Sequence, residues 1–210
     1  MFAEKNVGLF LQSAYHILQD NPLARFTIVG DGALRQSLEN LADRLQITWA
    51  VHFTGWVSGT DLPGLLAGVD IVINPSLRAW SETFCIANIE VMSMGVPLVT
   101  FAVGGIGEYV QDPSWPKNDN NNETLGAGSV GNSTSRRYVD PAGDFSVSTN
   151  AMVVHRATPV AIARATSFLI MHPERRKELA QRGRETVVAH FGVQRQMKQY
   201  AELYSYLHTL

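Results

Sequence analysis

The sequence lacks the features of a secreted or membrane-spanning protein. Cys85 is the only cysteine among 210 residues, so no disulfide can form within the chain. No apolar run approaches the ~20 residues that a helix needs to cross a bilayer. Charged residues follow Met1 at positions where a signal peptide would be apolar. A reducing, cytoplasmic compartment is therefore the simplest prediction.

A marked charge imbalance and a recognisable metal motif are also missing. The 17 basic and 19 acidic residues give a net charge of −2, so we expect no nucleic acid as a partner. The sequence contains no Asp-x-Asp pair and no histidine cluster that would hold a metal ion. With 45% hydrophobic and 17% charged residues, the composition is that of one globular domain, which we place at residues 1–210.

The most informative stretch is a strand–helix–strand unit in the middle of the chain. Residues 69–73 form an apolar, β-branched run that is typical of a buried strand, and residues 84–94 carry apolar side chains at helical spacing. Residues 97–102 form a second apolar run, which Gly104 and Gly105 close. This order predicts a βαβ unit whose functional loops follow the carboxyl ends of the strands.

Two carboxylates flank the start of the predicted helix. Glu82 and Glu90 are eight residues apart, which on a helix is about 12 Å of rise with both side chains on nearly the same side. The backbone N–H groups of residues 83–86 are the free donors of the first turn, and the helix dipole favours an anion there. A diphosphate at the helix tip with a sugar at each end suits this arrangement. These residues therefore point to a nucleotide-sugar as the ligand.

Three motifs in this region resemble those of a known family. They are Glu82-x7-Glu90, the segment Met92-Ser-Met-Gly-Val-Pro97, and Gly104-Gly-Ile-Gly-Glu108. Together they resemble the C-terminal, donor-binding domain of retaining GT-B glycosyltransferases of family 4, also called glycosyl transferases group 1. The resemblance implies an α/β fold, the C-terminal half of a GT-B fold, with a Rossmann-like parallel sheet flanked by helices and further helices at the C-terminus.

The resemblance also implies the chemistry and the residues that carry it. A hexosyl group would pass from a UDP- or GDP-linked donor to an acceptor hydroxyl, with retention at the anomeric carbon and without a metal ion or other cofactor. The catalytic residues would be Lys5, facing the donor diphosphate, and Glu82, holding the transferred sugar. Glu90 would hold the ribose. The donor-binding residues that the resemblance implies are Gly30, Gly32, Val57, Ser76, Phe84, Cys85, Ile86, Glu90, Gly104 and Gly105.

Three of these positions leave alternatives open. In the family, the first helix follows a strand that ends in an arginine, and both would lie upstream of Met1; Lys5 is therefore equally well read as a flexible terminal lysine. Cys85 stands where the family usually has glycine, so its side chain would crowd the phosphates. Trp56, next to Val57, either stacks on the base or covers the end of a strand.

A glycine turn near the N-terminus invites a different interpretation. Residues 25–29 predict a strand, and the Gly-Asp-Gly turn at residues 30–32 leads from it to a helix over residues 33–45. A dinucleotide fingerprint would need a third glycine at the position of Arg35. We therefore reject a dinucleotide-binding site.

The character of the chain changes after residue 110. Residues 111–150 are rich in Asn, Ser, Thr and Gly, which predicts a long mobile surface loop inserted into the domain. Residues 150–154 predict the last strand, and helices are expected over residues 160–171, 173–190 and 193–207. The apolar face of the last helix is expected to pack within the domain. In full GT-B enzymes this helix crosses to the other domain, so part of the face is expected to need that partner.

The resemblance leaves more than one function open. A GT-B enzyme has an N-terminal domain that supplies the acceptor site; that domain is missing from this chain, and any membrane association would come through it. The first hypothesis is the donor domain of a retaining glycosyltransferase, incomplete alone. The alternatives are a non-catalytic nucleotide-sugar-binding or interaction module and a GT-B sugar-nucleotide epimerase. For the epimerase the fold matches, but the Glu-x7-Glu motif with Met-Gly-Val-Pro does not.

Overall fold

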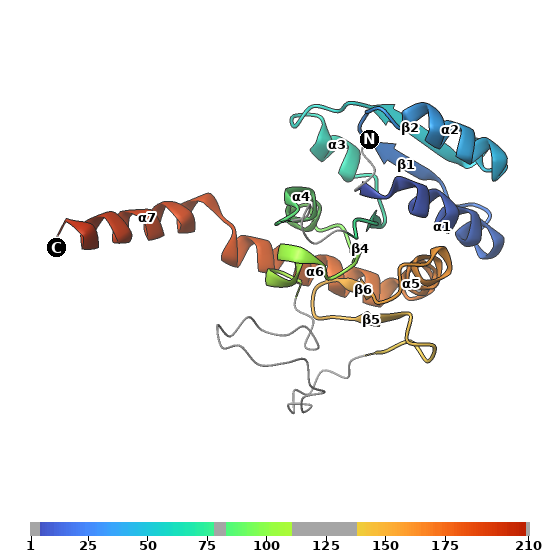
Figure 1. Ribbon diagram of the computed structural model, residues 1–210. Helices are drawn as coiled ribbons and strands as arrows, with labels where there is room; N and C mark the ends of the chain where they lie inside the picture. Colours follow the sequence, from blue (N-terminus) through green and yellow to red (C-terminus); the bar gives the residue numbers. More distant parts are fainter. Residues whose placement is uncertain (1–4, 78–82, 111–137, 209–210) are drawn as a thin grey trace.

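The computed structural model describes residues 5–77, 83–110 and 138–208, in which strands alternate with helices (Figure 1). The strands are β1 (Phe26–Val29), β2 (Val51–Gly55), β3 (Val72–Asn74), β4 (Leu98–Thr100), β5 (Phe145–Val147) and β6 (Met152–Val154). The helices are α1 (Val7–Asp20), α2 (Arg35–Arg44), α3 (Leu62–Leu66), α4 (Ile86–Ser93), α5 (Pro159–Met171), α6 (Pro173–His190) and α7 (Val193–Leu207), with 3-10 turns η2 (Thr48–Ala50) and η3 (Gly104–Glu108). Helices that connect parallel strands confirm the predicted α/β class.

The strands form two separate sheets. β1 pairs in parallel with β2, while β3, β4 and β6 form a parallel set to which β5 adds an antiparallel edge. Among the described residues, no strand joins β1 to β3. The doubly wound order assigns this place to the strand that precedes the first helix. The sheet is therefore interrupted at its centre rather than at an edge.

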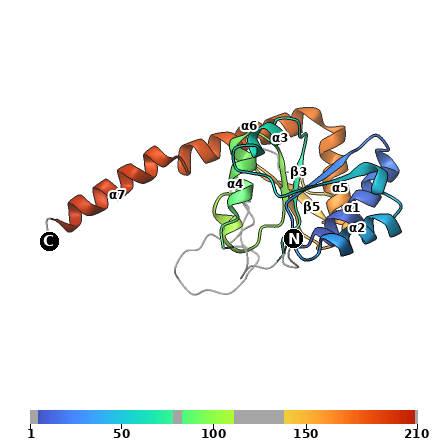
Figure 2. The same ribbon diagram turned by 90° about the horizontal axis from the view of Figure 1, so that it is seen from above.

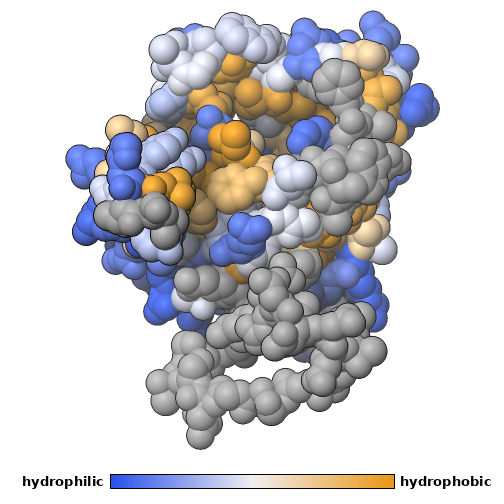
Figure 3. All heavy atoms as spheres, turned by 60° about the vertical axis from the view of Figure 1, so that its left-hand side comes forward, coloured by the Kyte–Doolittle hydropathy of each residue, from blue (hydrophilic) through white to orange (hydrophobic). Residues whose placement is uncertain are grey.

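The strands beside this interruption are less buried than the strands far from it. All residues of β4 and β6 are buried, as expected for parallel strands that are covered on both faces. β3 is only half-buried, and Val29 at the end of β1 is 41% exposed. Figure 3 shows that the upper part of the molecule, which carries β1 and β2 in Figure 1, is hollowed and that hydrophobic side chains line the hollow. The interruption thus leaves apolar surface open.

Helix packing holds the two sheets together. α1 packs along α5, and Leu11 and Ile17 of α1 share a buried cluster with Phe26 and Ile28 of β1. Ile73 of β3 contacts this cluster and also the cluster around β4, β6 and α5. The position of the β1–β2 sheet therefore depends on side-chain packing through α1.

Helix α4 starts later than predicted and turns a different side to the core. It begins at Ile86, because Cys85 has a left-handed φ of 57° and lies outside the helix. Ala87 is exposed and Met94 is 36% exposed, although the apolar spacing had grouped them with Val91. The residues that α4 buries are Asn88, Val91 and Met92.

The last part of the expected mobile insertion is instead ordered. Residues 111–137 lie outside the described residues, whereas Phe145–Val147 form β5 against β6. The guanidinium of Arg164 holds the turn before β5, because it donates to the buried carboxylates of Asp140 (2.6 Å) and Asp144 (3.0 Å). A strand of three residues gives too short an alternation to be predicted from the sequence.

Helix α7 leaves the body of the domain. Figures 1 and 2 show it projecting away from the sheets, and none of its residues is buried. The prediction that its apolar face packs within the domain is therefore wrong. Phe191, just before α7, does pack inside, edge-on against Phe84 and Tyr109. No helix in the described part of the chain is both long and apolar enough to span a bilayer. The exposed apolar side chains of α7 include Met197, Tyr200, Leu203, Tyr204 and Leu207.

Turn η3 and the loop before α4 approach each other closely at Gly105. A Cβ added to Gly105 would overlap the carbonyl oxygen of Thr83, and it would lie 2.7 Å from the carbonyl carbon and 3.2 Å from Cα of Phe84. These are backbone atoms, which cannot rotate away as the end of a side chain can. The loop that leads into α4 therefore requires glycine at position 105.

We expect hydrogen exchange to reveal the interruption in the sheet. β1 pairs only with β2, and β3 pairs only with β4, so each has one edge without a strand partner among the described residues. The amides on these edges should exchange on the order of 100-fold faster than those of β4 and β6. Residue-resolved exchange followed by NMR measures this difference. Equal protection in β1, β3 and β4 would contradict an interrupted sheet.

The Gly105→Ala substitution should lower the free energy of unfolding by about 2–3 kcal/mol, because the added methyl group forces two backbone segments apart. Gly59→Ala is the matched control, since nothing lies within 4 Å of a Cβ at that position. The control should change the free energy by less than about 0.5 kcal/mol. Urea denaturation measures both variants, and equal stabilities would show that the close approach is absent.

Candidate functional site

The candidate site lies where parallel strands end and α4 begins. Parallel strands place their carboxyl ends at the same edge of a sheet, and the loops after these ends form ligand sites in α/β folds. The predicted donor-binding residues occupy these loops: Gly30 and Gly32 follow β1, Val57 follows β2, Ser76 follows β3, and Gly104 and Gly105 follow β4.

The N-terminus of α4 is exposed and has no side-chain cap among the residues that the structure describes. Ile86, its first residue, is 68% exposed, and Thr83 and Ala87 are exposed as well. The cap residue Cys85 makes no side-chain hydrogen bond to the first-turn amides. The positive end of the helix dipole therefore reaches the surface. A phosphate group can bind at such an end through backbone N–H groups.

Glu90 lies on the same exposed side of α4. It is exposed and follows Ile86 by four residues, or about 6 Å of helix rise. A carboxylate at this distance can accept hydrogen bonds from hydroxyl groups of a ligand whose anionic group is at the helix tip. Glu82 lies outside the described residues, so only Glu90 of the predicted pair can be placed.

A buried set of polar side chains lies behind the helix tip. Asn74, the last residue of β3, donates from Nδ2 to Oδ1 of Asn88 (2.9 Å) and to Sγ of Cys85 (3.2 Å). Nδ2 of Asn88 donates to the hydroxyl of Tyr109 (3.0 Å), which in turn donates to the carbonyl of Cys85 (3.5 Å). Asn88 and Tyr109 are each 1% exposed. We did not predict this set from the sequence. The one available signal was Asn88, an asparagine among the apolar residues of a predicted helix.

The side chain of Cys85 lies on the core side of the helix start. Its Sγ accepts the hydrogen bond from Asn74, and the side chain packs against the cluster that contains Val91 and Ile106. The thiol therefore does not occupy the exposed side of the tip. Crowding of a phosphate by this residue, which the sequence led us to expect, has no support in the structure.

Ser76 carries a buried hydroxyl group that has no hydrogen-bond partner among the described residues. The residue is 1% exposed, and its backbone N–H donates to Oδ1 of Asn74 (3.1 Å). A buried polar atom without a partner is unfavourable. The Oγ atom of Ser76 therefore lacks the partner that a buried hydroxyl normally has, at a position that the resemblance assigns to donor binding.

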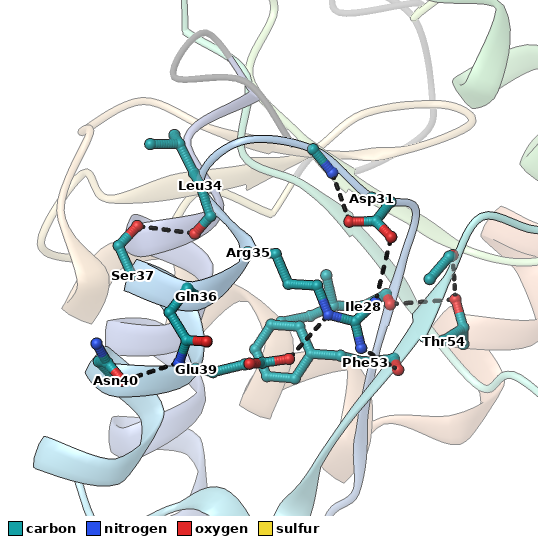
Figure 4. Close-up of polar contacts among 12 residues, drawn as sticks. Ile28, Asp31, Leu34, Arg35, Gln36, Ser37, Glu39, Asn40, Phe53 and Thr54 are labelled. Carbon is teal, nitrogen blue, oxygen red and sulfur yellow. Dashed lines mark hydrogen bonds and ion pairs between the residues drawn. The ribbon is translucent and has the colours of Figure 1, made fainter.

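Arg35 holds the glycine turn after β1 in place (Figure 4). Its Nε donates to Glu39 (2.8 Å), and its two Nη groups donate to Asp31 (3.5 Å) and to the carbonyl of Phe53 (3.3 Å). The hydrogen bond to Glu39, together with the charges of Glu39 and Asp31, raises the pKa of the Arg35 guanidinium above its usual value. Arg35 thus stands at the position where a dinucleotide-binding turn has its third glycine.

The turns after β1 and β2 are joined by backbone. Gly30 and Gly32 have φ angles of 115° and 148°, and the N–H of Gly30 donates to the carbonyl of Gly55 (2.8 Å). Val57 is half-buried beyond this bond. Trp56 is 77% exposed, so its indole does not cover the end of a strand. Its alternative role, stacking on a base, stays a prediction.

Two further predicted residues lie at turns. Lys5 is exposed and directly precedes Asn6, the cap residue of α1, whose φ is 49°. Gly104 opens η3 with a φ of 54°, a conformation that favours glycine. Across the three described segments, no group of three His, Cys, Asp or Glu side chains could hold a metal ion. An open pocket of about 350 Å³ lies away from the α4 tip, between Gly95, Pro97 and the start of α6.

Known proteins share sequence with half or more of the chain. The family model described as glycosyl transferases group 1 matches residues 1–124. An uncharacterized glycosyltransferase of Methanocaldococcus jannaschii is 32% identical over 108 residues, which are 51% of this chain and 27% of that protein. The alpha-D-kanosaminyltransferase of Streptomyces kanamyceticus is 30% identical over 110 residues, 52% of this chain and 28% of that protein. The match thus spans about a quarter of the length of these curated relatives.

Solved structures share the fold at low sequence identity. The C-terminal domain of a glycosyl transferase group 1 family protein (LpcC) from Francisella tularensis matches with a TM-score of 0.65 and 18% identity, over 92% of this chain and 83% of that one. HepE from Anabaena, in complex with UDP and glucose, matches with a TM-score of 0.72 and 19% identity, over 97% of this chain and 45% of that one. These neighbours are GT-B glycosyltransferases, so the fold that the resemblance implied is confirmed. With its fold and more than half of its residues matched, the chain belongs to the glycosyl transferases group 1 family.

Proposed function

We propose that this chain is the donor-binding domain of a retaining glycosyltransferase that uses a UDP- or GDP-linked hexose. The observation that carries the proposal is the exposed, uncapped start of α4 with Glu90 on the same side of the helix. The diphosphate would bind the first-turn amides, and Glu90 would accept hydrogen bonds from the ribose. Structures of HepE from Anabaena with UDP and with UDP-glucose support a nucleotide-sugar as the ligand.

The reaction would transfer the hexosyl group to an acceptor hydroxyl. The bond between the anomeric carbon and the diphosphate oxygen breaks, the acceptor oxygen bonds to the same face of that carbon, and the acceptor hydroxyl gives its proton to the leaving diphosphate oxygen. Negative charge grows on the leaving diphosphate, where the α4 dipole and Lys5 would stabilise it in place of a metal ion. Glu82 would hold the transferred sugar.

The complete enzyme would also need an acceptor site, for which we propose a separate domain. Because the match spans about a quarter of the curated relatives, we assign the acceptor site to an N-terminal domain, through which any membrane association would also occur. The cytoplasm, as the source of nucleotide-sugars, would be the compartment of this domain. Donor binding is the step that the domain alone should perform.

UDP should stabilise the domain, and Glu90→Ala should remove most of this effect. At a UDP concentration of 100 times Kd, the free energy of unfolding rises by about 2.7 kcal/mol, which corresponds to roughly 5–10 °C in Tm for a chain of this size. Differential scanning fluorimetry with UDP and with GDP measures the shift.

Glu202→Ala is the matched control, because Glu202 is an exposed helical glutamate on α7, the helix that projects from the body. This variant should keep the full shift with UDP. If Glu90→Ala also keeps the full shift, the ribose assignment fails. If neither UDP nor GDP shifts the unmodified domain, donor binding itself is refuted.

The Ser76→Ala substitution should weaken UDP binding about fivefold or more without lowering stability. The Oγ atom has no partner to lose among the described residues, so the free energy of unfolding should change by less than about 1 kcal/mol. Ser13→Ala provides the contrast, because it removes a buried hydrogen bond to the carbonyl of Leu9 (2.7 Å). Calorimetric titration with UDP should find unchanged affinity in Ser13→Ala; unchanged affinity in Ser76→Ala would exclude Ser76 from the site.

A further inference from the structure

The start of α4 has a backbone conformation that needs support. Cys85 has φ 57° and ψ 73°, in the left-handed region that residues other than glycine adopt at a cost in free energy. Its carbonyl accepts the first hydrogen bond of the helix, from the N–H of Asn88 (3.0 Å). The direction of the exposed first-turn amides therefore depends on how this one residue is held.

Two polar side chains, those of Tyr109 and Asn74, contact Cys85 from the core side, and Asn88 bonds to both of them. Tyr109 donates its hydroxyl hydrogen to the carbonyl of Cys85 (3.5 Å) and accepts from Nδ2 of Asn88 (3.0 Å). Asn74 donates to both Asn88 and the sulfur of Cys85. The contacts form a closed path that links the end of β3, the start of α4 and η3. Buried hydrogen bonds of this kind stabilise the structure when every polar group has a partner. A buried group that loses its partner costs free energy.

The polar groups of Asn88 and Tyr109 are not needed for the packing of the core. Asn88 lies on the buried side of α4 beside Val91 and Met92, where an apolar side chain would pack without polar partners. The ring of Tyr109 already packs against Phe84 (5.4 Å between centroids) and Phe191 (6.1 Å), and its hydroxyl adds only the polar contacts. The carboxamide and the hydroxyl therefore serve the geometry of the helix start.

We propose that Asn88 and Tyr109 are positioning residues that fix Cys85 in its left-handed conformation and so aim the first-turn amides of α4 at the donor diphosphate. The proposal rests on the proposed function for its ligand, since it refines how the same site binds. Neither residue touches the donor. Their loss would change the site by letting the helix start adopt other conformations, while the fold is kept.

The test uses Tyr109→Phe, which keeps the aromatic packing and removes only the hydroxyl, with Asn88→Ala as a second variant. Two measurements report on the conformation at the start of α4: UDP affinity by calorimetric titration, and the rate at which a thiol reagent modifies Cys85. Because Cys85 is the only cysteine in the chain, the rate reports on this position alone. Arg164→Ala, which removes the guanidinium that pairs with the buried carboxylates of Asp140 and Asp144, is the control for a general loss of stability.

Tyr109→Phe should weaken UDP binding about tenfold, because it removes both the contact with Asn88 (3.0 Å) and the longer contact with Cys85 (3.5 Å), and it should speed modification of Cys85 by a similar factor. Arg164→Ala should change neither readout, although its Tm should fall at least as far as that of Tyr109→Phe, because two buried carboxylates lose a charged partner. Should Asn88→Ala fail to fold, Tyr109→Phe decides the question alone. Unchanged affinity and thiol rate in Tyr109→Phe would overturn the proposal.

The two proposals can fail separately. If the unmodified domain binds UDP and Tyr109→Phe binds it equally well, the positioning role fails and the proposed function stands. If the unmodified domain binds neither UDP nor GDP, the proposed function fails, and the thiol rates alone then decide whether Tyr109 holds Cys85. A rate equal to that of the unmodified domain would refute that role as well.

Discussion

The close approach of η3 to the backbone before α4 is the constraint on which the candidate site depends. Because Gly105 has no side chain, the carbonyl group of Thr83 can lie against it. The same approach brings the hydroxyl of Tyr109 within hydrogen-bond distance of Cys85 and Asn88. A single missing Cβ therefore allows the contacts that determine where α4 begins and which of its amides reach the surface.

The two halves of the site are joined to the domain in different ways. The half around α4 shares one buried cluster with β4, η3 and α6. The half around the first glycine turn belongs to the β1–β2 sheet, which has no strand ladder to β3 among the described residues. Arg35 and the Gly30–Gly55 hydrogen bond stabilise that half internally. Its position relative to α4 depends on the packing of α1 against α5.

Sequence patterns predicted a helix or strand correctly where the residues that determine it lie within or directly beside it. Helix α5 is an example, because Thr158 caps it through a hydrogen bond to the N–H of Ala161, and Pro159 occupies its first position. β5 was missed because three residues carry little pattern and the turn before it depends on Arg164, which is at least 20 residues away. The apolar face of α7 was visible in the sequence, but a pattern does not say what covers a face.

The same difference separates the residues of the candidate site that could be predicted from those that could not. The motifs identified the residues that face outward, such as Glu90 and Ile86, whereas the residues that support them emerged only in three dimensions. Asn88 and Glu90 are two positions apart, which turns their side chains about 200° apart around the helix. One is buried among partners 14 and 21 residues away, and the other is exposed. The polar residue on the exposed side of α4 thus follows from a motif, whereas the polar residue on its buried side is recognised only from its partners in three dimensions.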